Sequence, residues 1–143
     1  MDRISAGVRG EHRLLVSSEL SIDFMGQEEA RVLATPHLIW NLEVAARNAI
    51  KPLLEEGFDS VGTEVNVKHL AATPLGMSVL FRAEVTHRDG NRVRFHVEAL
   101  DEKEKIAEGS HERYIVNIAR FATRVQAKAA AATERRVPLS RCH

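Results

Sequence analysis

The apolar residues between Ser60 and Ile118 fall on alternating positions, with polar side chains between them. A period of two is the pattern of β-strands that bury one face. The dipeptide Asp89-Gly90 separates two of these runs and predicts a hairpin turn. The chain is therefore expected to form antiparallel strands with a common apolar face. The predicted inward residues of the two central strands are Met77, Val79, Phe81, Ala83 and Val85, then Val93, Phe95, Val97 and Ala99.

Two further strands are expected on either side of this region. His12–Ser18 is the predicted first strand, and the polar stretch Glu19–Arg31 is predicted to be a loop with one short turn. Ile106–Ile118 is the predicted last strand, and its alternation is disturbed near Gly109, which suggests a β-bulge. In the strand that begins at Ser60, alternation puts three valines on one face: Val61, Val65 and Val67.

One long helix is predicted over Val32–Leu54. Thr35 is a favourable N-cap and Pro36 suits the first helical position, while Pro52 and Gly57 end the helix. Apolar residues recur at spacings of three and four, the pattern of a buried stripe: Leu38, Leu42, Ala45, Ala49 and Leu53. A single helix must then cover the apolar face of the strands, which predicts an α+β fold. Such a sheet has edge strands that dimerisation could pair.

Charge and composition exclude several classes of protein. The 143 residues carry no net charge, but residues 120–143 hold six basic side chains and one acid, so residues 1–119 are mildly acidic. This balance does not predict a nucleic-acid-binding domain, and no apolar run approaches the roughly 20 residues of a membrane span. The start of the chain lacks the apolar core of a secretory signal, which predicts a cytoplasmic protein. The one cysteine, Cys142, allows no internal disulfide.

Glu43 interrupts an apolar row of the predicted helix, between Ile39 and Ala46. A carboxylate in such a row costs free energy unless it is paired or used chemically. Two interpretations are open. Glu43 either lies at the rim, where it reaches water or an arginine, or serves as a catalytic carboxylate.

His69 has the same parity as Val65 and Val67 and should point toward the helix. A lone inward histidine is most often a hydrogen-bonded core residue, but with a helix carboxylate it could act as a general base or polarising group. Thr35 lies at the helix N-terminus, where N–H groups can polarise a carbonyl. Thr35 and Glu43 are separated by about 12 Å along the helix axis. A shared site therefore needs a substrate that spans them or a second subunit.

His111 and Arg113 share one face of the last strand. The arginine could bind an anion, pair with Glu43, or form a surface ion pair. No histidine–carboxylate spacing typical of a metal site is present, and there is neither a glycine-rich phosphate loop nor a nucleophile elbow. The sequence predicts no metal.

Three runs, VLATPHLIWNLEVAARNAI, VGTEVNVKHLAATPLGMSV and GSHERYIV, resemble the fluoroacetyl-coenzyme A (CoA) thioesterase family of the hotdog-fold thioesterases. The resemblance covers residues 8–121. The predicted organisation is a catalytic domain of residues 1–121, followed by a basic, Ala-rich tail of residues 122–143 that is helical or disordered and lies outside the resemblance. It implies a hotdog fold, in which a five-stranded antiparallel sheet wraps one long central helix. It also implies a homodimer or a dimer of dimers with active sites at the subunit interface.

The resemblance further implies a catalytic threonine, glutamate and histidine. By motif these fall on Thr35, Glu43 and His69, and Gly62 and Arg113 take substrate-positioning roles. The implied activity is hydrolysis of an acyl-CoA thioester to a carboxylate and free CoA. CoA is then part of the substrate, and no separate cofactor is expected. Water could attack directly, or Thr35 or Glu43 could form an acyl-enzyme.

One stretch departs from the family. The fluoroacetyl-specific enzyme has phenylalanines in a lid just before its threonine motif, whereas residues 26–31 here, GQEEAR, contain no aromatic residue. An aromatic lid is therefore not expected, and the resemblance supports thioester hydrolysis better than fluoroacetyl specificity. Two alternatives are a hotdog module that binds acyl-CoA without cleaving it and, less favoured, a hydratase or dehydratase, since no Asp/His loop motif of that type is present.

Overall fold

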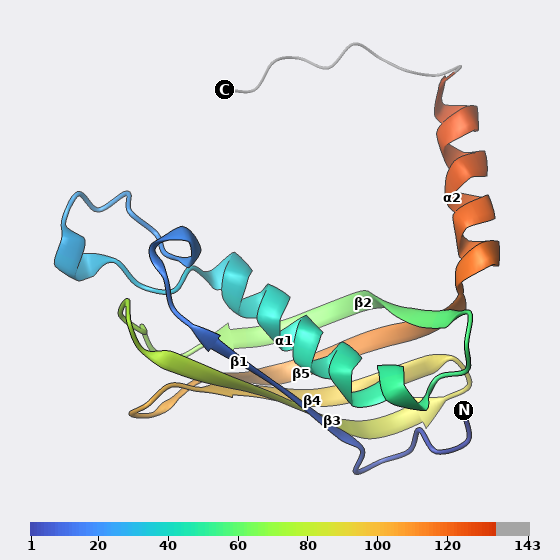
Figure 1. The fold of residues 1–143 in the computed structure, drawn as a ribbon, viewed down its shortest axis with the longest axis horizontal. Helices are drawn as coiled ribbons and strands as arrows, with labels where there is room; N and C mark the ends of the chain where they lie inside the picture. The colour runs from blue at the N-terminus through green and yellow to red at the C-terminus, as the bar shows by residue number, and fades with distance from the viewer. Residues whose placement is uncertain (134–143) are drawn as a thin grey trace.

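Five antiparallel strands form one sheet that curls around helix α1 (Figure 1). The computed structural model describes residues 1–133. The strand order is β1-β3-β4-β5-β2, which leaves β1 and β2 as the edges of the sheet. The strands are β1 (Arg9–Leu15), β2 (Phe58–His69), β3 (Ser78–Asp89), β4 (Arg92–Leu100) and β5 (Lys105–Asn117). The helices are α1 (Thr35–Ile50) and α2 (Ile118–Thr133), with the short 3₁₀ helices η1 (Ser18–Leu20), η2 (Glu28–Ala30) and η3 (Lys51–Leu53).

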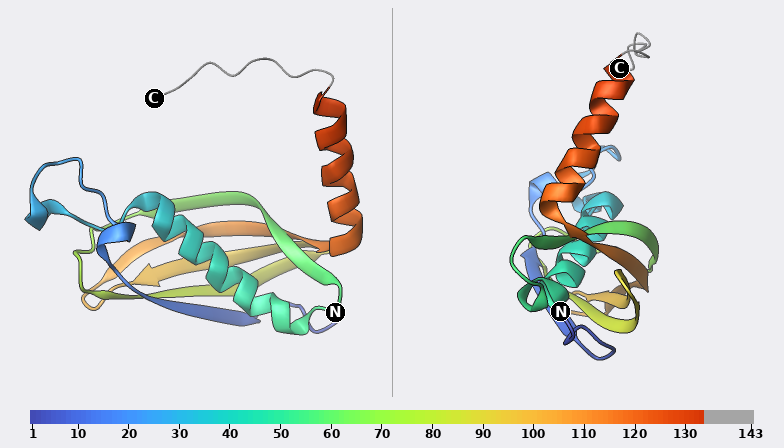
Figure 2. Two further views of the ribbon diagram at one scale, coloured as in Figure 1. Left: turned by 45° about the horizontal axis from the view of Figure 1, so that its top comes forward. Right: turned by 90° about the vertical axis from the view of Figure 1, so that its right-hand side faces the viewer.

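Helix α1 packs on the inner face of the sheet, and Figure 2 shows the strands curving around it. Its buried residues recur every three or four positions, as the predicted stripe requires. The alternation in β3 and β4 also holds, so the predicted α+β arrangement is confirmed. The core contains Leu38, Leu42, Ala45 and Ala49 of the helix, and Val79, Phe81, Ala83, Val85, Val93, Phe95, Val97 and Ala99 of the sheet.

Helix α1 runs from Thr35 to Ile50 and is therefore shorter than the predicted Val32–Leu54. The residues just before it are extended and bridged to neighbouring segments. Ala34 is the N-cap, and its carbonyl accepts the N–H of Leu38 at 3.0 Å. The prediction that Thr35 caps the helix is therefore wrong. Thr35 is the first helical residue, and its side chain makes no capping hydrogen bond.

Strand β1 begins and ends three residues earlier than the predicted His12–Ser18. Its ladder with β3 closes where Leu15 lies opposite Ser78, the first residue of β3. One more hydrogen bond, from the N–H of Val16 to the carbonyl of Met77, follows at 2.9 Å. The partner strand thus sets where β1 ends, and the loop that follows contains η1 and η2 rather than one short turn.

A β-bulge in β2 makes the predicted face of Val61 wrong. The register with β5 shifts around Thr63, so the residues before and after it have opposite parity. Val61 lies opposite the exposed Tyr114, whereas Val65 lies opposite the buried His111. Only the part of the strand after the bulge follows the predicted alternation.

The predicted disturbance near Gly109 is confirmed, because the register of β5 with β4 shifts at Ile106, between the pairs Ala99–Ala107 and Leu100–Lys105. Gly109 itself pairs regularly with Val67 of β2 and Val97 of β4. Its lack of a side chain has another cause. A Cβ at this position would collide with the carbonyl oxygen of Asn66 and lie 2.7 Å from the Cα of Val67. These are backbone atoms of a paired strand, so they cannot move aside without a large cost in free energy. The close approach of β2 therefore requires glycine at this position.

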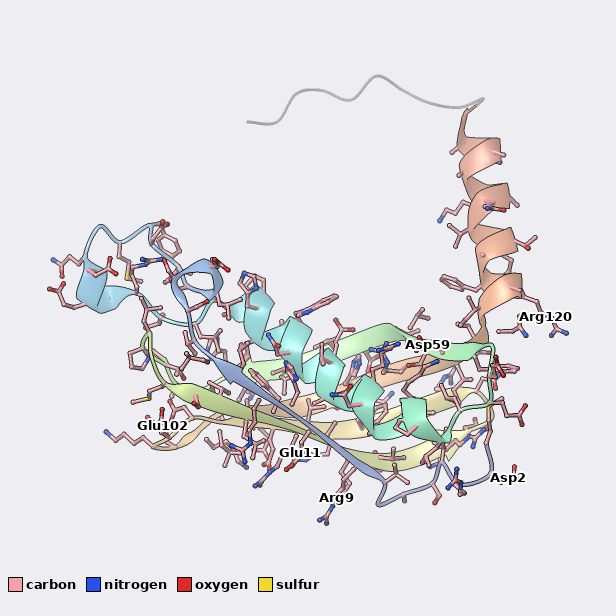
Figure 3. All side chains as sticks on the ribbon, viewed as in Figure 1. Asp2, Arg9, Glu11, Asp59, Glu102 and Arg120 are labelled. Carbon is pink, nitrogen blue, oxygen red and sulfur yellow. The ribbon has the colours of Figure 1, made fainter. Side chains whose placement is uncertain are left out.

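The outer face of the sheet carries a network of ion pairs. Arg82 lies 3.4 Å from Glu11 and 3.5 Å from Glu98. Arg9 pairs with Glu84 at 2.6 Å, and Figure 3 shows Arg9 and Glu11 on the side of the sheet away from α1. Exposed pairs of this kind contribute little to stability, so this face is chiefly a hydrated surface.

Helix α2 projects away from the sheet at the end of β5 (Figure 1). Asn117 caps it, because its Oδ1 accepts the N–H of Arg120 at 3.0 Å. The helix starts four residues before the predicted tail 122–143 and includes its first part. Residues 134–143, with Cys142, lie outside the described residues. Within residues 1–133, no helix combines the length and apolar character needed to cross a membrane.

Substitution of Gly109 by alanine is expected to lower the free energy of unfolding by about 1–3 kcal/mol, because the added Cβ overpacks the β2–β5 contact. Urea unfolding followed by circular dichroism measures the change. Ser110→Ala, on the neighbouring half-buried position, is the matched control and should shift stability by no more than about 0.5 kcal/mol. Equal unfolding midpoints for wild type and Gly109→Ala would contradict the close approach.

Candidate active site

Thr35 and His69 form a hydrogen-bonded pair at the N-terminal end of α1. Thr35 Oγ1 lies 2.8 Å from His69 Nδ1. The first turn of α1 carries the threonine, and the last residue of β2 is the histidine. The prediction that His69 points toward the helix is confirmed. The fold thus brings together two of the three predicted catalytic residues.

The environment of His69 favours the neutral imidazole. Burial is the largest influence and lowers its pKa below the ordinary value of 6.5, and the nearby backbone of Ala71 offsets this only in part. Its Nε2 is buried and has no hydrogen-bond partner among the described residues. An unpaired buried nitrogen is costly, so a bound molecule that pairs with Nε2 would be favoured there.

A largely apolar hollow of about 520 Å³ borders this pair. Leu70 and Ala71 line it beside His69, and Ile22 and Phe24 line it from the loop between β1 and α1. Apolar walls with a few polar groups are typical of small-molecule sites.

Arg31 holds that loop in place. Its Nη2 donates to the carbonyl of Ser18 at 2.9 Å and to the hydroxyls of Ser18 and Ser21 at 2.8 Å each. Phe24 is 77% exposed and borders the hollow. Residues 26–31 contain no aromatic residue, so Phe24 is the aromatic ring that this loop brings to the hollow.

Glu43 lies in a second group of polar side chains, on the side of α1 that faces β2 and β5. Its Oε1 is 3.5 Å from Nη1 of Arg113, which is the pairing proposed from the sequence. Gly62 lies against the same carboxylate. A Cβ there would collide with Oε1 of Glu43 and lie 3.2 Å from Cε1 of His111. Gly62 therefore leaves the space that the carboxylate occupies.

Arg113 is buried and rigidly held. Its Nε donates to Ser60 Oγ at 2.7 Å, and its Nη2 donates to the Ser60 carbonyl at 2.8 Å. Burial lowers the pKa of the guanidinium, while the negative charge of Glu43 opposes this change. Arginine remains charged in proteins, so Arg113 presents a fixed cation to Glu43.

His111 and Ser60 belong to this second group but were not among the predicted site residues. His111 is 1% exposed, with Nδ1 2.8 Å from the carbonyl oxygen of Glu64 and Nε2 3.8 Å from Glu43 Oε1. The shared face of His111 and Arg113 was visible in the sequence and is confirmed. Ser60 had no comparable signal, because a serine at the start of a strand is common.

No hydrogen bond or ion pair joins the two groups within the described part of the chain. Thr35 and Glu43 lie on one helix at a separation of about 12 Å along its axis. One chain therefore presents the threonine–histidine pair at one end of α1 and the carboxylate–arginine group near its middle. Within residues 1–133, no three histidine, cysteine, aspartate or glutamate side chains meet in a way that could hold a metal ion.

The family model described as fluoroacetyl-CoA-specific thioesterase matches residues 16–119. The chain belongs to this family. Among curated proteins, a fluoroacetyl-CoA thioesterase from Streptantibioticus cattleyicolor is 32% identical over 133 residues, which cover 89% of this chain and 96% of that protein.

Solved structures of thioesterases share the fold. A threonine-to-serine variant of the fluoroacetyl-CoA enzyme in complex with acetyl-CoA is 31% identical, with a TM-score of 0.80 over 87% of this chain and 98% of that one. A thioesterase superfamily member from Thermus thermophilus is 32% identical, with a TM-score of 0.78 over 94% of this chain and 97% of that one. The expected hotdog fold and family are confirmed.

The half-buried His69 and the buried His111 predict a loss of stability in mild acid. Burial lowers the pKa of both His69 and His111 below 6.5, so below about this pH the unfolded chain binds protons that the folded chain does not. The free energy of unfolding should therefore fall as the pH drops from 7.5 to 5.5, in urea titrations at one protein concentration. His69→Asn should reduce this slope, whereas His87→Asn, at an exposed position, should keep it. A pH-independent wild type would contradict the prediction.

Proposed function

We propose that this acyl-CoA thioesterase hydrolyses its substrate with Thr35, Glu43 and His69, at a site that two subunits build together. The products are a carboxylate and free CoA. The observation that carries the proposal is the 2.8 Å hydrogen bond between Thr35 and His69 beside an apolar hollow, in a chain of a thioesterase family. CoA is part of the substrate, and the proposed reaction uses no separate cofactor.

The acyl group is proposed to occupy the hollow next to Thr35. A related structure holds acetyl-CoA, which supports an acyl-CoA ligand for this fold. The thioester oxygen gains negative charge as the carbonyl is attacked, and the positive end of the α1 dipole stabilises that charge. The apolar lining from Phe24 and Leu70 suits a hydrocarbon or other apolar acyl chain.

Neutral His69 is suited to the role of general base. Through Nδ1 it can accept the proton of the Thr35 hydroxyl or of a water molecule that replaces this contact. Attack on the carbonyl carbon forms a C–O bond and breaks the C–S bond, and the sulfur leaves and is protonated as free CoA. If Thr35 or Glu43 attacks, an acyl-enzyme forms and water cleaves it in a second step. Arg113 holds Glu43, and Gly62 leaves space beside its carboxylate.

A dimer through β2 would unite the two groups. β2 is a twelve-residue edge strand, and two large apolar side chains, Trp40 on α1 and Leu70 just after β2, are 65% and 54% exposed. The other edge, β1, is only seven residues long and exposes charged Arg9 as well as Leu15. Isologous antiparallel pairing of two β2 strands would bring the first half of one, near Gly62 and Glu43, toward the end of the other, near the partner's His69.

Removal of each catalytic group should abolish most turnover. Thr35→Ala, Glu43→Gln and His69→Ala are each expected to lower kcat by about 10²–10⁴-fold, the usual contribution of a positioned acid or base. Thiol release is measured on acyl-CoA esters from acetyl to long-chain and aryl. Arg82→Gln, on the outer face, is the control and should keep wild-type kcat.

Full turnover in all three variants would overturn the residue assignment. No thiol release by the wild type on any ester, with retained CoA binding, would instead favour the non-catalytic binding module. Mass spectrometry of Glu43→Gln and Thr35→Ala after mixing with substrate separates the routes, since a trapped acyl group identifies covalent catalysis and its position identifies the nucleophile.

Mixing two inactive variants tests the shared site. Suppose that each site takes Thr35 from one chain and Glu43 from the other. A heterodimer of one Thr35→Ala chain and one Glu43→Gln chain then has one site with both substitutions and one intact site. Random exchange of subunits should then restore about a quarter of wild-type activity, as expected for an isologous dimer. If each site uses one chain only, every site keeps a lesion and no activity returns. Two preparations of the same variant, mixed alike, are the control.

A further inference from the structure

The contacts of His111 determine which of its ring nitrogens carries the proton. Nδ1 lies 2.8 Å from the backbone carbonyl oxygen of Glu64, and a carbonyl oxygen only accepts hydrogen bonds. Nδ1 must therefore donate. In the neutral ring, Nε2 is then left with a lone pair.

The lone pair on Nε2 faces a donor. Nη1 of Arg113 lies 3.3 Å from Nε2, and a guanidinium only donates. The same Nη1 is 3.5 Å from Oε1 of Glu43. Nη1 of Arg113, which carries two N–H groups, thus contacts both a neutral imidazole and the Glu43 carboxylate.

The remaining neighbours favour the neutral form. The ring of His111 stacks on Phe95 of β4, with centroids 6.0 Å apart at 27°. The charged groups that act on it are Arg113 on its own strand, Glu43 on α1 and Glu112 on the outer face of β5. Burial is the largest influence and lowers the pKa of His111.

We propose that His111 is a positioning residue: its neutral Nδ1–H form accepts a hydrogen bond from Nη1 of Arg113 and so holds this nitrogen 3.5 Å from Glu43 Oε1, which leaves the carboxylate loosely paired and available for chemistry. Protonated at Nε2, His111 would donate toward Glu43 Oε1, which lies 3.8 Å away, and would repel Arg113. Glu43 would then be held by a charged imidazole and would be a weaker base or nucleophile. This inference rests on the proposed role of Glu43 in thioester hydrolysis.

Histidine ¹⁵N chemical shifts in the full-length wild type give a direct test. The expected spectrum at pH 7.5 shows His111 neutral, with the proton on Nδ1. Protonated His111, or a neutral ring with its proton on Nε2, would overturn the proposal. This measurement needs no variant and does not depend on turnover.

Two substitutions of His111 test the two hydrogen bonds of its ring separately. The amide of His111→Asn can still donate to the Glu64 carbonyl but offers no acceptor to Arg113. The longer amide of His111→Gln can present its oxygen to Arg113. His111→Asn is expected to lower kcat by about 10- to 100-fold, the scale of a small misplacement of a reacting group, with a smaller change in KM. His111→Gln should recover most of this loss.

The pH profile of kcat distinguishes a positioning role of His111 from a purely structural role. Glutamine does not protonate, so the acid limb of kcat in His111→Gln should move to lower pH relative to wild type. His69 titrates in both proteins, and the difference between the profiles is therefore due to His111. Equal losses in both variants that follow their losses of stability, with an unchanged pH profile, would show a purely structural role. Wild-type turnover in Glu43→Gln would instead refute the proposed role of Glu43, on which this inference rests, whatever the state of His111.

Discussion

The packing of one helical stripe against a curled sheet sets the distances in the candidate site. Leu38, Leu42 and Ala45 are buried on the inner face, so the position and rotation of α1 are fixed. Apolar burial of this kind is the main favourable term in folding. The same helix carries Thr35 in its first turn and Glu43 two turns later. Once the stripe is buried, one residue must meet the end of β2 and the other must face β5.

The bulge at Thr63 adapts β2 to this helix. It reverses the parity of the strand, so that Ser60 and Gly62 face α1 before it and Val65 faces α1 after it. It also precedes the Glu64 carbonyl that accepts the hydrogen bond from His111. A buried cation is strongly destabilising when unpaired, and Arg113 avoids this through Ser60, His111 and Glu43. The polar group around Glu43 is therefore preorganised before any substrate arrives.

Periodicity predicted the helix and the central strands because it reports which side chains can be buried together. It did not predict the positions where one segment constrains another. Thr35 has the chemistry of an N-cap, yet the extended residues before it place Ala34 at that position. The alternation of β5 is disturbed near Gly109, yet the bulge lies at Ile106, and Gly109 itself is required by the approach of a neighbouring strand. Val61 was assigned to the wrong face because one extra residue in β2 changes every parity before it.

By itself, the sequence determined the α+β class, the apolar faces of the helix and the central strands, and, through its motifs, five residues of the candidate site: Thr35, Glu43, Gly62, His69 and Arg113. Only the tertiary structure decided which of their atoms meet. Thr35 and His69 are 34 positions apart, and Glu43 and Arg113 are 70 positions apart. Their contacts depend on the strand register, on a bulge and on the position of α1 on the sheet. A hydrogen bond forms or is lost over fractions of an ångström. Local periodicity carries no information at that scale, which is why Thr35 proved to be the partner of a histidine and His111 proved to be part of the site.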